Sequence, residues 1–180
     1  MSEFFELKVA GLTRQLPICK VNDHLSIAAF IMFSDIEMTV AAATELLRRV
    51  PEYDVLLTAE SKGIPLAYEM SRQSGKKYIL ARKSVKLYMR DPVEVDVKSI
   101  TTANPQKLYL DAEDLHYLKN KRVLVVDDVI STGRSLQSLE SLVEKAGGII
   151  AGKAAVLAEG EASEREDIIY LAPLPVFPKE

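Results

Sequence analysis

The stretch Val123-Leu-Val-Val-Asp-Asp-Val-Ile-Ser-Thr-Gly-Arg-Ser135 joins a run of aliphatic residues to two adjacent carboxylates and a small, hydroxyl-rich turn. The aliphatics at 123–126 are typical of a strand buried on both faces, as in a parallel sheet, and Asp127-Asp128 are expected to mark its carboxyl end. A helical pattern of leucines follows the turn and is closed by Gly147-Gly148. The stretch therefore predicts a strand, a turn and a helix in immediate succession.

The turn Ser131-Thr132-Gly133-Arg134-Ser135 has the chemistry of an anion-binding loop. Backbone N–H groups at the start of a helix, the positive end of the helix dipole and three hydroxyls all favour a bound anion. Gly133 would let the backbone approach a phosphate in a conformation that other residues rarely adopt. A plainer interpretation makes Ser or Thr a helix cap and the aspartates turn formers. The chain has no Gly-x-x-x-x-Gly-Lys-Ser/Thr sequence, so a Walker-type nucleotide hydrolase is not supported.

Composition sets the outer limits of the prediction. The 180 residues are 48% hydrophobic, enough for one sizeable core, and we expect a single domain over 1–180. The net charge of −3 and the lack of a long basic run do not indicate a nucleic-acid or membrane partner. One cysteine, Cys19, excludes an internal disulfide and fits a reducing compartment, and no signal peptide or membrane span is visible. A cytoplasmic protein is the expectation.

Strand and helix patterns alternate along the chain. Expected strands cover 54–59, 77–81, 107–110, 122–126 and 149–157, and an extended arm broken by Gly11 and Pro17 covers 4–18. Expected helices run from Asp35 to Val50, where Pro51 would stop the first, from Ile64 to Gln73, and from about Ser135. This order predicts an α/β fold with a largely parallel sheet, helices on both faces, and a ligand at the carboxyl ends of the strands.

Two further segments follow predicted strands and carry charge. Ser61-Lys62-Gly63 lies between a strand and a helix, where Ser61 would by itself be read as a helix cap. Arg82, Lys83 and Lys86 supply three cations within five residues, which by itself is as readily a solvated charge cluster.

The residues 125–135 resemble, without a gap, the 5-phosphoribosyl pyrophosphate (PRPP) binding motif of the type I phosphoribosyltransferases. The resemblance implies that Asp127 and Asp128 hold the ribose 2′- and 3′-hydroxyls, and that Ser131, Thr132, Gly133, Arg134 and Ser135 wrap the 5′-phosphate. The chemistry agrees, because carboxylates accept hydrogen bonds from a vicinal diol while amides and hydroxyls donate to a phosphate.

Other parts of the chain extend the resemblance toward the adenine and xanthine members of that family. Ser61, Lys62 and Gly63 match a pyrophosphate-binding turn, with lysine in place of the family's arginine. Arg82, Lys83 and Lys86 match a segment that contacts pyrophosphate and opens a mobile loop, here 82–106, with alternating valines that suggest a hairpin and with Glu94 as a candidate acid/base group. Residues 1–34 are similar to the hood that covers the base, where Phe30 and Phe33 are core aromatics or base-stacking groups.

The resemblance implies a type I phosphoribosyltransferase fold and transfer of the 5-phosphoribosyl group of PRPP to a purine, adenine first, giving AMP and pyrophosphate. Asp127, Asp128, Arg82, Lys83 and Lys86 would be the catalytic residues, and Mg²⁺ would be held chiefly by substrate and water, with the two aspartates near it, through water. The family also implies a homodimer. Xanthine stays open as the substrate, because Ser131 does not decide between the two bases. A PRPP sensor without catalysis and a nucleotide-binding domain acting through protein partners are the remaining alternatives.

Overall fold

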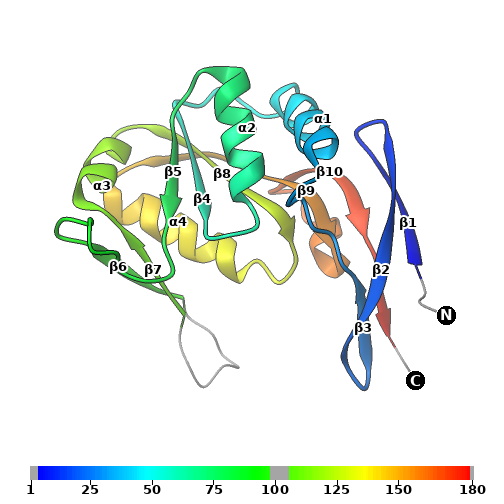
Figure 1. Cartoon of the computed structure of the whole chain (residues 1–180). Coiled ribbons are helices and arrows are strands. Elements are labelled where there is room, and N and C mark those ends of the chain that lie inside the picture. Colours follow the sequence, from blue (N-terminus) through cyan, green and yellow to red (C-terminus); the bar gives the residue numbers. More distant parts are fainter. Residues whose placement is uncertain (1–3, 98–105, 179–180) are drawn as a thin grey trace.

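The computed structural model describes residues 4–97 and 106–178 and places a five-stranded parallel sheet at the centre of the molecule (Figure 1). The strand order is β10 (Ile169–Leu174), β9 (Ile149–Glu159), β8 (Arg122–Ile130), β4 (Val55–Ala59) and β5 (Tyr78–Ala81). The chain passes from β4 outward to β5, then returns to the other side of β4 and continues through β8, β9 and β10. The carboxyl ends of β4 and β8 therefore flank the point where the winding direction reverses, which is where open α/β sheets bind ligands.

Helices cover both faces of this sheet, as the sequence predicts. One face carries α1 (Ile36–Leu47) and α2 (Ile64–Ser74), and the other carries α3 (Ala112–Leu118) and α4 (Arg134–Ala146) (Figure 1). Every residue of β4 is buried, since apolar side chains pack against it from both sides. The two faces form separate hydrophobic cores, one built around Met38, Leu46 and Met70 and the other around Leu139 and Leu142.

Both ends of the chain form a separate antiparallel sheet, which contains most of the region predicted to be a hood and is called the hood sheet below. Strands β1 (Phe4–Val9), β2 (Leu12–Asn22) and β3 (Leu25–Ala28) are followed in the sheet by β11 (Val176–Pro178). It lies beyond β10 at the right of Figure 1. Strand β11 was not predicted, because three residues leave no periodicity to detect.

A two-stranded hairpin of β6 (Val93–Val97) and β7 (Gln106–Leu110) stands apart from the central sheet. The pairing of Val93 with Leu110 and of Val97 with Gln106 confirms the predicted hairpin. Residues 98–105, the middle of the expected mobile loop 82–106, lie outside the described residues.

Three boundaries differ from the sequence prediction. Pro17 does not break β2, since it lies opposite Phe4, the first residue of β1. Helix α1 begins at its cap Asp35 as expected but ends at Leu47, where the chain makes a turn whose Arg49 and Val50 N–H groups both donate to the Leu46 carbonyl. Strand β8 continues to Ile130, past the aspartates, because β9 keeps pairing with it as far as Ala158.

No helix among the described residues is long and apolar enough to cross a membrane.

Candidate functional site: the carboxyl ends of β4 and β8

Strands β4 and β8 end at different heights, and this stagger builds the site. They pair from Val55 with Val123 to Leu57 with Val125, after which β4 continues to Ala59 beside β5 alone and β8 runs on to Ile130 beside β9. The β8 residues beyond Val125 therefore have no strand on their β4 side. Asp127 and Asp128 lie in this extension, and the turn after β4 lies next to them.

The two aspartates form a tightly coupled pair. Asp127 accepts a hydrogen bond through Oδ1 from the Asp128 backbone N–H at 2.9 Å. Asp128 is only 2% exposed, and its buried Oδ2 has no hydrogen-bond partner among the described residues. Burial, and then the charge of Asp128, raise the pKa of Asp127 to about 8. The carboxylates of Asp127 and Asp128 therefore have acceptor capacity left for the hydrogen-bond donors of a ligand.

Lys62 is the cation at this pair. Its Nζ lies 4.0 Å from Asp128 Oδ2, at the limit of an ion pair, and its side chain is 58% exposed. Such a long, solvent-exposed contact compensates the buried charge only in part. The lysine can therefore turn toward an anion without losing a strong bond.

Gly63 lets the Ser61–Gly63 turn lie against Asp127. A Cβ at position 63 would lie 2.5 Å from Thr58 Oγ1 and 3.0 Å from Asp127 Oδ1. Thr58 is fully buried, and its hydroxyl oxygen has no partner among the described residues. Glycine is thus required by close approach, and Thr58 is a polar group of the site that the sequence analysis did not single out.

The loop after β8 forms a small cavity of about 40 Å³ lined by Asp127, Val129 and residues 130–136. Gly133 has a φ of +75°, which confirms the expected positive-φ glycine. Helix α4 begins directly after it, and no side chain caps the helix. The N–H groups of the first turn remain available to an anion, so Ser131, Thr132, Gly133, Arg134 and Ser135 do come together as one cradle.

Glu60 ties the cationic segment to the β4 turn. It accepts the Lys83 backbone N–H at 2.7 Å, and its Oε1 lies 2.9 Å from Arg82 Nε. The backbone of Arg82 also bridges to Tyr109 on β7. The sequence analysis gave Glu60 no role, although an acidic residue directly before a cationic turn was a visible signal.

Lys86 is held differently from its two neighbours. Its Nζ donates to Ser84 Oγ at 2.8 Å, and the residue is half-buried. Among the predicted cations, Arg82 and Lys83 therefore contact the β4 turn through Glu60, whereas Lys86 contacts only its own loop in the bonds described.

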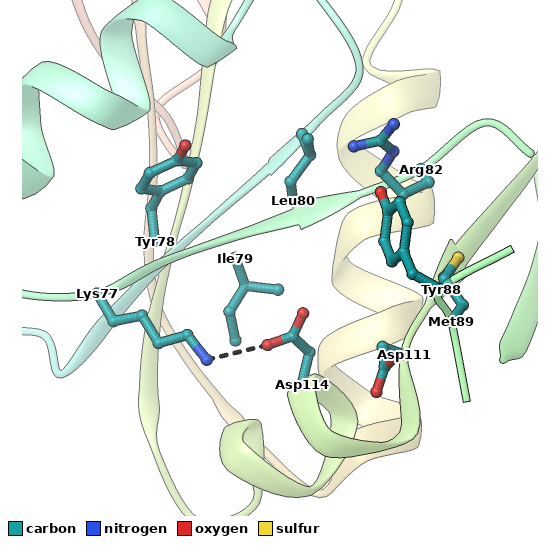
Figure 2. A pocket seen from close by; sticks show the side chains of 9 residues that line it. All are labelled: Lys77, Tyr78, Ile79, Leu80, Arg82, Tyr88, Met89, Asp111 and Asp114. Atoms are coloured by element: carbon teal, nitrogen blue, oxygen red, sulfur yellow. Dashed lines mark hydrogen bonds and ion pairs between the residues drawn. The ribbon is translucent and has the colours of Figure 1, made fainter. Parts of the chain in front are cut away.

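A larger cavity of about 330 Å³ opens on the outer side of β5 (Figure 2). Figure 2 shows Arg82 beside Tyr88 at one end and the Lys77–Asp114 ion pair, 3.0 Å long, at the other. Arg82 is the single predicted site residue in its lining. Neither aspartate of the pair lines this cavity, and Arg82 is the residue of the predicted site that it shares.

Glu94 is engaged within the hairpin. It accepts a hydrogen bond from Lys107 Nζ at 2.8 Å, which is the main cause of a lowered Glu94 pKa. Its backbone carbonyl accepts from Lys145 of α4 at 2.9 Å. This geometry favours an ionised Glu94 and gives no support to Glu94 as a proton donor.

Glu159, at the end of β9, and Arg165, after the strand, also lie near the site. Burial raises the pKa of Glu159, the last residue of β9, and the charge of Lys62 opposes the shift. Arg165 lies with Nη1 2.6 Å from where a Cβ on Gly133 would be. Nothing in the sequence marks either residue, because both reach the site through the packing of β9 against β8.

Of the two aromatics named in the sequence analysis, Phe30 is a core residue and Phe33 is 48% exposed.

A parallel sheet with paired carboxylates and the uncapped first turn of a helix at its switch point defines an α/β protein with a candidate ligand site at the carboxyl ends of its strands. The chain belongs to the phosphoribosyl transferase domain family, which matches residues 32–172.

Curated relatives carry three different substrate names. The chain is 36% identical over 118 residues to an adenine phosphoribosyltransferase of Cenarchaeum symbiosum, covering 64% of this chain and 66% of the relative. It is 33% identical over 135 residues to a xanthine phosphoribosyltransferase of Bacillus cereus, covering 73% and 68%. It is also 33% identical over 124 residues to a hypoxanthine/guanine phosphoribosyltransferase of Methanococcus voltae, covering 68% and 63%. The chain thus spans about two thirds of the length of these relatives.

Solved structures agree with the type I phosphoribosyltransferase fold. The adenine phosphoribosyltransferase of Thermoanaerobacter pseudethanolicus superposes with a TM-score of 0.67 at 19% identity, covering 79% of this chain and 84% of that one. That of Leishmania tarentolae superposes with a TM-score of 0.65 at 19% identity, covering 97% and 83%.

Proposed function

We propose that this protein transfers the 5-phosphoribosyl group of PRPP to a purine base and releases pyrophosphate, with adenine as the leading substrate and AMP as the product. The observation that carries the proposal is the pair of buried Asp128 and partly buried Asp127, which lies directly before the Ser131–Ser135 loop at the switch point of the sheet, in a chain of the phosphoribosyl transferase domain family. The two parts suit the two ends of one ligand, since the carboxylates accept from a ribose diol and the cradle donates to its 5′-phosphate.

The reaction breaks the bond between the anomeric carbon and the pyrophosphate oxygen. A bond to a purine ring nitrogen forms, the nitrogen loses its proton, and pyrophosphate leaves with the electron pair. Because negative charge builds on the leaving group, cations at the β4 turn and the β5 end stabilise the transition state most. The side-chain contacts to Asp128 and Glu60 support Lys62 and Arg82 for this role. Lys83 is anchored to Glu60 through its backbone N–H, and its ammonium, with that of Lys86, would join them when the loop moves.

Mg²⁺ fits the donor set as a substrate-bound ion. No group of three or more metal-binding side chains is found in the described part of the chain, so a cage made by the protein alone is not supported there. Asp127 and Asp128, with the unpaired Oδ2 of Asp128, suit an ion held mainly by pyrophosphate, ribose and water oxygens. The ion would neutralise charge on the leaving pyrophosphate.

The choice of base rests on the relatives. Their names include adenine, xanthine and hypoxanthine/guanine, and the highest identity given above, 36%, is to an adenine enzyme. Solved adenine enzymes also share the fold, one of them from Saccharomyces cerevisiae in complex with adenine. Adenine is therefore the first substrate to test and xanthine the second, and either would place the protein in purine salvage.

We further propose a homodimer working in the cytoplasm. Apolar residues are exposed around a mostly apolar cavity of about 240 Å³ between α1 and α2, among them Phe33 (48%), Ile36 (77%) and Tyr68 (58%). A second copy of the chain would cover such a patch. A reducing compartment suits the single cysteine.

The test is release of pyrophosphate from PRPP and Mg²⁺ with adenine, xanthine, hypoxanthine, guanine and orotate in separate assays. Turnover with adenine alone is the expected result. Turnover with another base would replace the substrate and keep the reaction. PRPP binding in calorimetry without turnover on any base would overturn catalysis and favour a PRPP-binding regulator.

A further inference from the structure

Arg165 packs against the centre of the phosphate cradle. It follows the short helix η1 (Gly160–Glu164), and its Nη1 and Cζ would lie 2.6 and 3.9 Å from a Cβ placed on Gly133. The guanidinium thus occupies the space beside the one residue of the cradle with a positive φ. Any side chain at position 133 would have to displace it.

Asp167 holds this guanidinium in a fixed orientation. Arg165 Nε donates to Asp167 Oδ1 at 2.8 Å and Nη2 to Oδ2 at 2.7 Å, a bidentate pair. These two bonds use the edge of the guanidinium away from Nη1. Nη1 is the atom at the cradle and makes no hydrogen bond within residues 4–97 and 106–178.

The same aspartate connects the arginine to the helix that begins at the cradle. Lys153 Nζ, on β9, donates to Asp167 Oδ2 at 2.6 Å and to Glu140 Oε1 of α4 at 2.9 Å. The lysine side chain is only 14% exposed and Asp167 is 52% exposed, so the lysine end of the network is the one shielded from solvent. One network therefore reaches both the loop at Gly133 and the body of α4.

An ordinary explanation is a salt-bridge network that merely staples η1 to the sheet, and exposed pairs of this kind contribute little. A purely structural salt-bridge network does not explain two observations. The guanidinium meets a glycine that must be in a left-handed conformation, and the nitrogen nearest that glycine is the one with unused donors. Both follow if the arginine serves the cradle.

We propose that Arg165 is a positioning residue for the 5′-phosphate cradle. It supports the loop at Gly133 in the conformation that exposes the N–H groups of the first turn of α4, and it adds a positive charge behind the loop. The inference rests on the proposed function, because it takes the anion in the cradle to be the 5′-phosphate of PRPP.

The test separates the two anionic ends of PRPP by calorimetry with ribose 5-phosphate, inorganic pyrophosphate and PRPP. Arg165→Ala is expected to weaken ribose 5-phosphate and PRPP binding about tenfold, the value of one charge-assisted contact, and to leave pyrophosphate binding unchanged. In steady-state assays KM for PRPP should rise by the same factor, with kcat within about twofold of the wild type. Arg165→Lys keeps the charge and should recover part of the loss.

Arg122→Ala is the matched control. It removes an equivalent bidentate pair, Nη2 to Asp54 Oδ1 at 2.8 Å and Nε to Oδ2 at 3.2 Å, at the amino end of β8. It should leave all three affinities unchanged. Asp167→Asn provides a second variant should Arg165→Ala unfold, and it is expected to weaken ribose 5-phosphate selectively as well.

Unchanged ribose 5-phosphate affinity in a folded Arg165 or Asp167 variant would overturn the inference, and so would an equal loss for pyrophosphate. Failure of the proposed function looks different, because the wild-type protein would then bind none of the three ligands and the inference would fall with it. Ligand binding without turnover would leave the Arg165 result interpretable.

Discussion

Asp128 places an unpaired carboxylate oxygen in the interior before any ligand arrives. Asp128→Asn removes that charge, so we expect the unligated protein to be as stable as the wild type or more stable, by about 1 kcal/mol. PRPP affinity should fall at least about tenfold, because an amide replaces one acceptor of the ribose diol with a donor. Thermal unfolding and PRPP titration measure the two effects, with Asp114→Asn on α3 as the control. Unchanged PRPP affinity would contradict the ribose assignment.

The raised pKa of Asp127 gives the free protein a particular pH dependence. Its folded-state pKa, about 8, exceeds the unfolded value of about 4, so its stabilising contribution is complete below pH 4 and is lost as the pH rises to 8. Asp54 and Asp167 have the opposite effect on stability, because their arginine partners lower the pKa of both carboxyl groups. Their stabilising contributions are therefore lost as the pH falls. Urea denaturation between pH 5 and 8 should show a smaller loss of stability with rising pH for Asp127→Asn than for the wild type. Parallel pH profiles would count against the coupled pair.

Residues that act through local chemistry could be predicted from the sequence. Adjacent aspartates after an aliphatic run and a glycine in a hydroxyl-rich turn are recognisable because neighbours in the chain make the site. Thr58 and Arg165 could not be, because each meets its partner across a strand boundary that only the fold brings together, whereas Glu60 had a signal in the sequence that was not used. Lys86 was predicted beside Arg82 and Lys83, but spacing alone does not determine which side chain turns back to the β4 end.

At the scale of elements, the segment after β5 is attached to the β4 turn by backbone as well as side chain. Lys83→Ala keeps the N–H that donates to Glu60, so the segment should stay in place. We expect the Lys83→Ala, Lys86→Ala double variant to lower kcat by about a hundredfold while PRPP binding is partly retained, because the cations stabilise developing charge on pyrophosphate. Single-turnover and PRPP-binding assays separate the two quantities.

Lys119 and Lys121, before the amino end of β8, offer a matched double alanine variant with the same change of net charge. Turnover should be unaffected by it. Equal losses in the two double variants would point to net charge as the cause and remove the specific role of the segment.

Long elements were easier to predict than short ones for a physical reason. Helix α2 carries a pattern of buried and exposed residues over 11 positions and ends at Gly75 as expected, and strand β4 stands out as an unbroken buried run. Helix α3 was missed because its seven residues bury only Leu118, although Asp111 caps it by accepting the Glu113 N–H at 2.8 Å. Strand β8 was predicted too short because pairing with β9, and not its own composition, carries it past the aspartates.

The whole molecule joins a parallel sheet to a hood whose sheet needs both ends of the chain. Phe5 of β1 and Phe177 of β11 meet edge to face, with ring centroids 6.0 Å apart. Phe177→Ala should destabilise the hood sheet by about 1–2 kcal/mol. If this sheet covers the base, as the family resemblance implies, KM for the purine should rise more than KM for PRPP. Phe4→Ala removes an exposed ring of β1 and serves as the control. A larger change in KM for PRPP than for the purine would contradict the assignment of the hood to the purine base.

The position of β11 in the sequence has a consequence for biosynthesis. It pairs with β3, Val176 opposite Ile27, and every other described element precedes it. Only Pro175 separates β11 from β10, the last strand of the central sheet, so the two sheets are completed at almost the same moment of synthesis. A nascent chain therefore gains its complete central sheet and the complete sheet of its two ends together, near the end of translation.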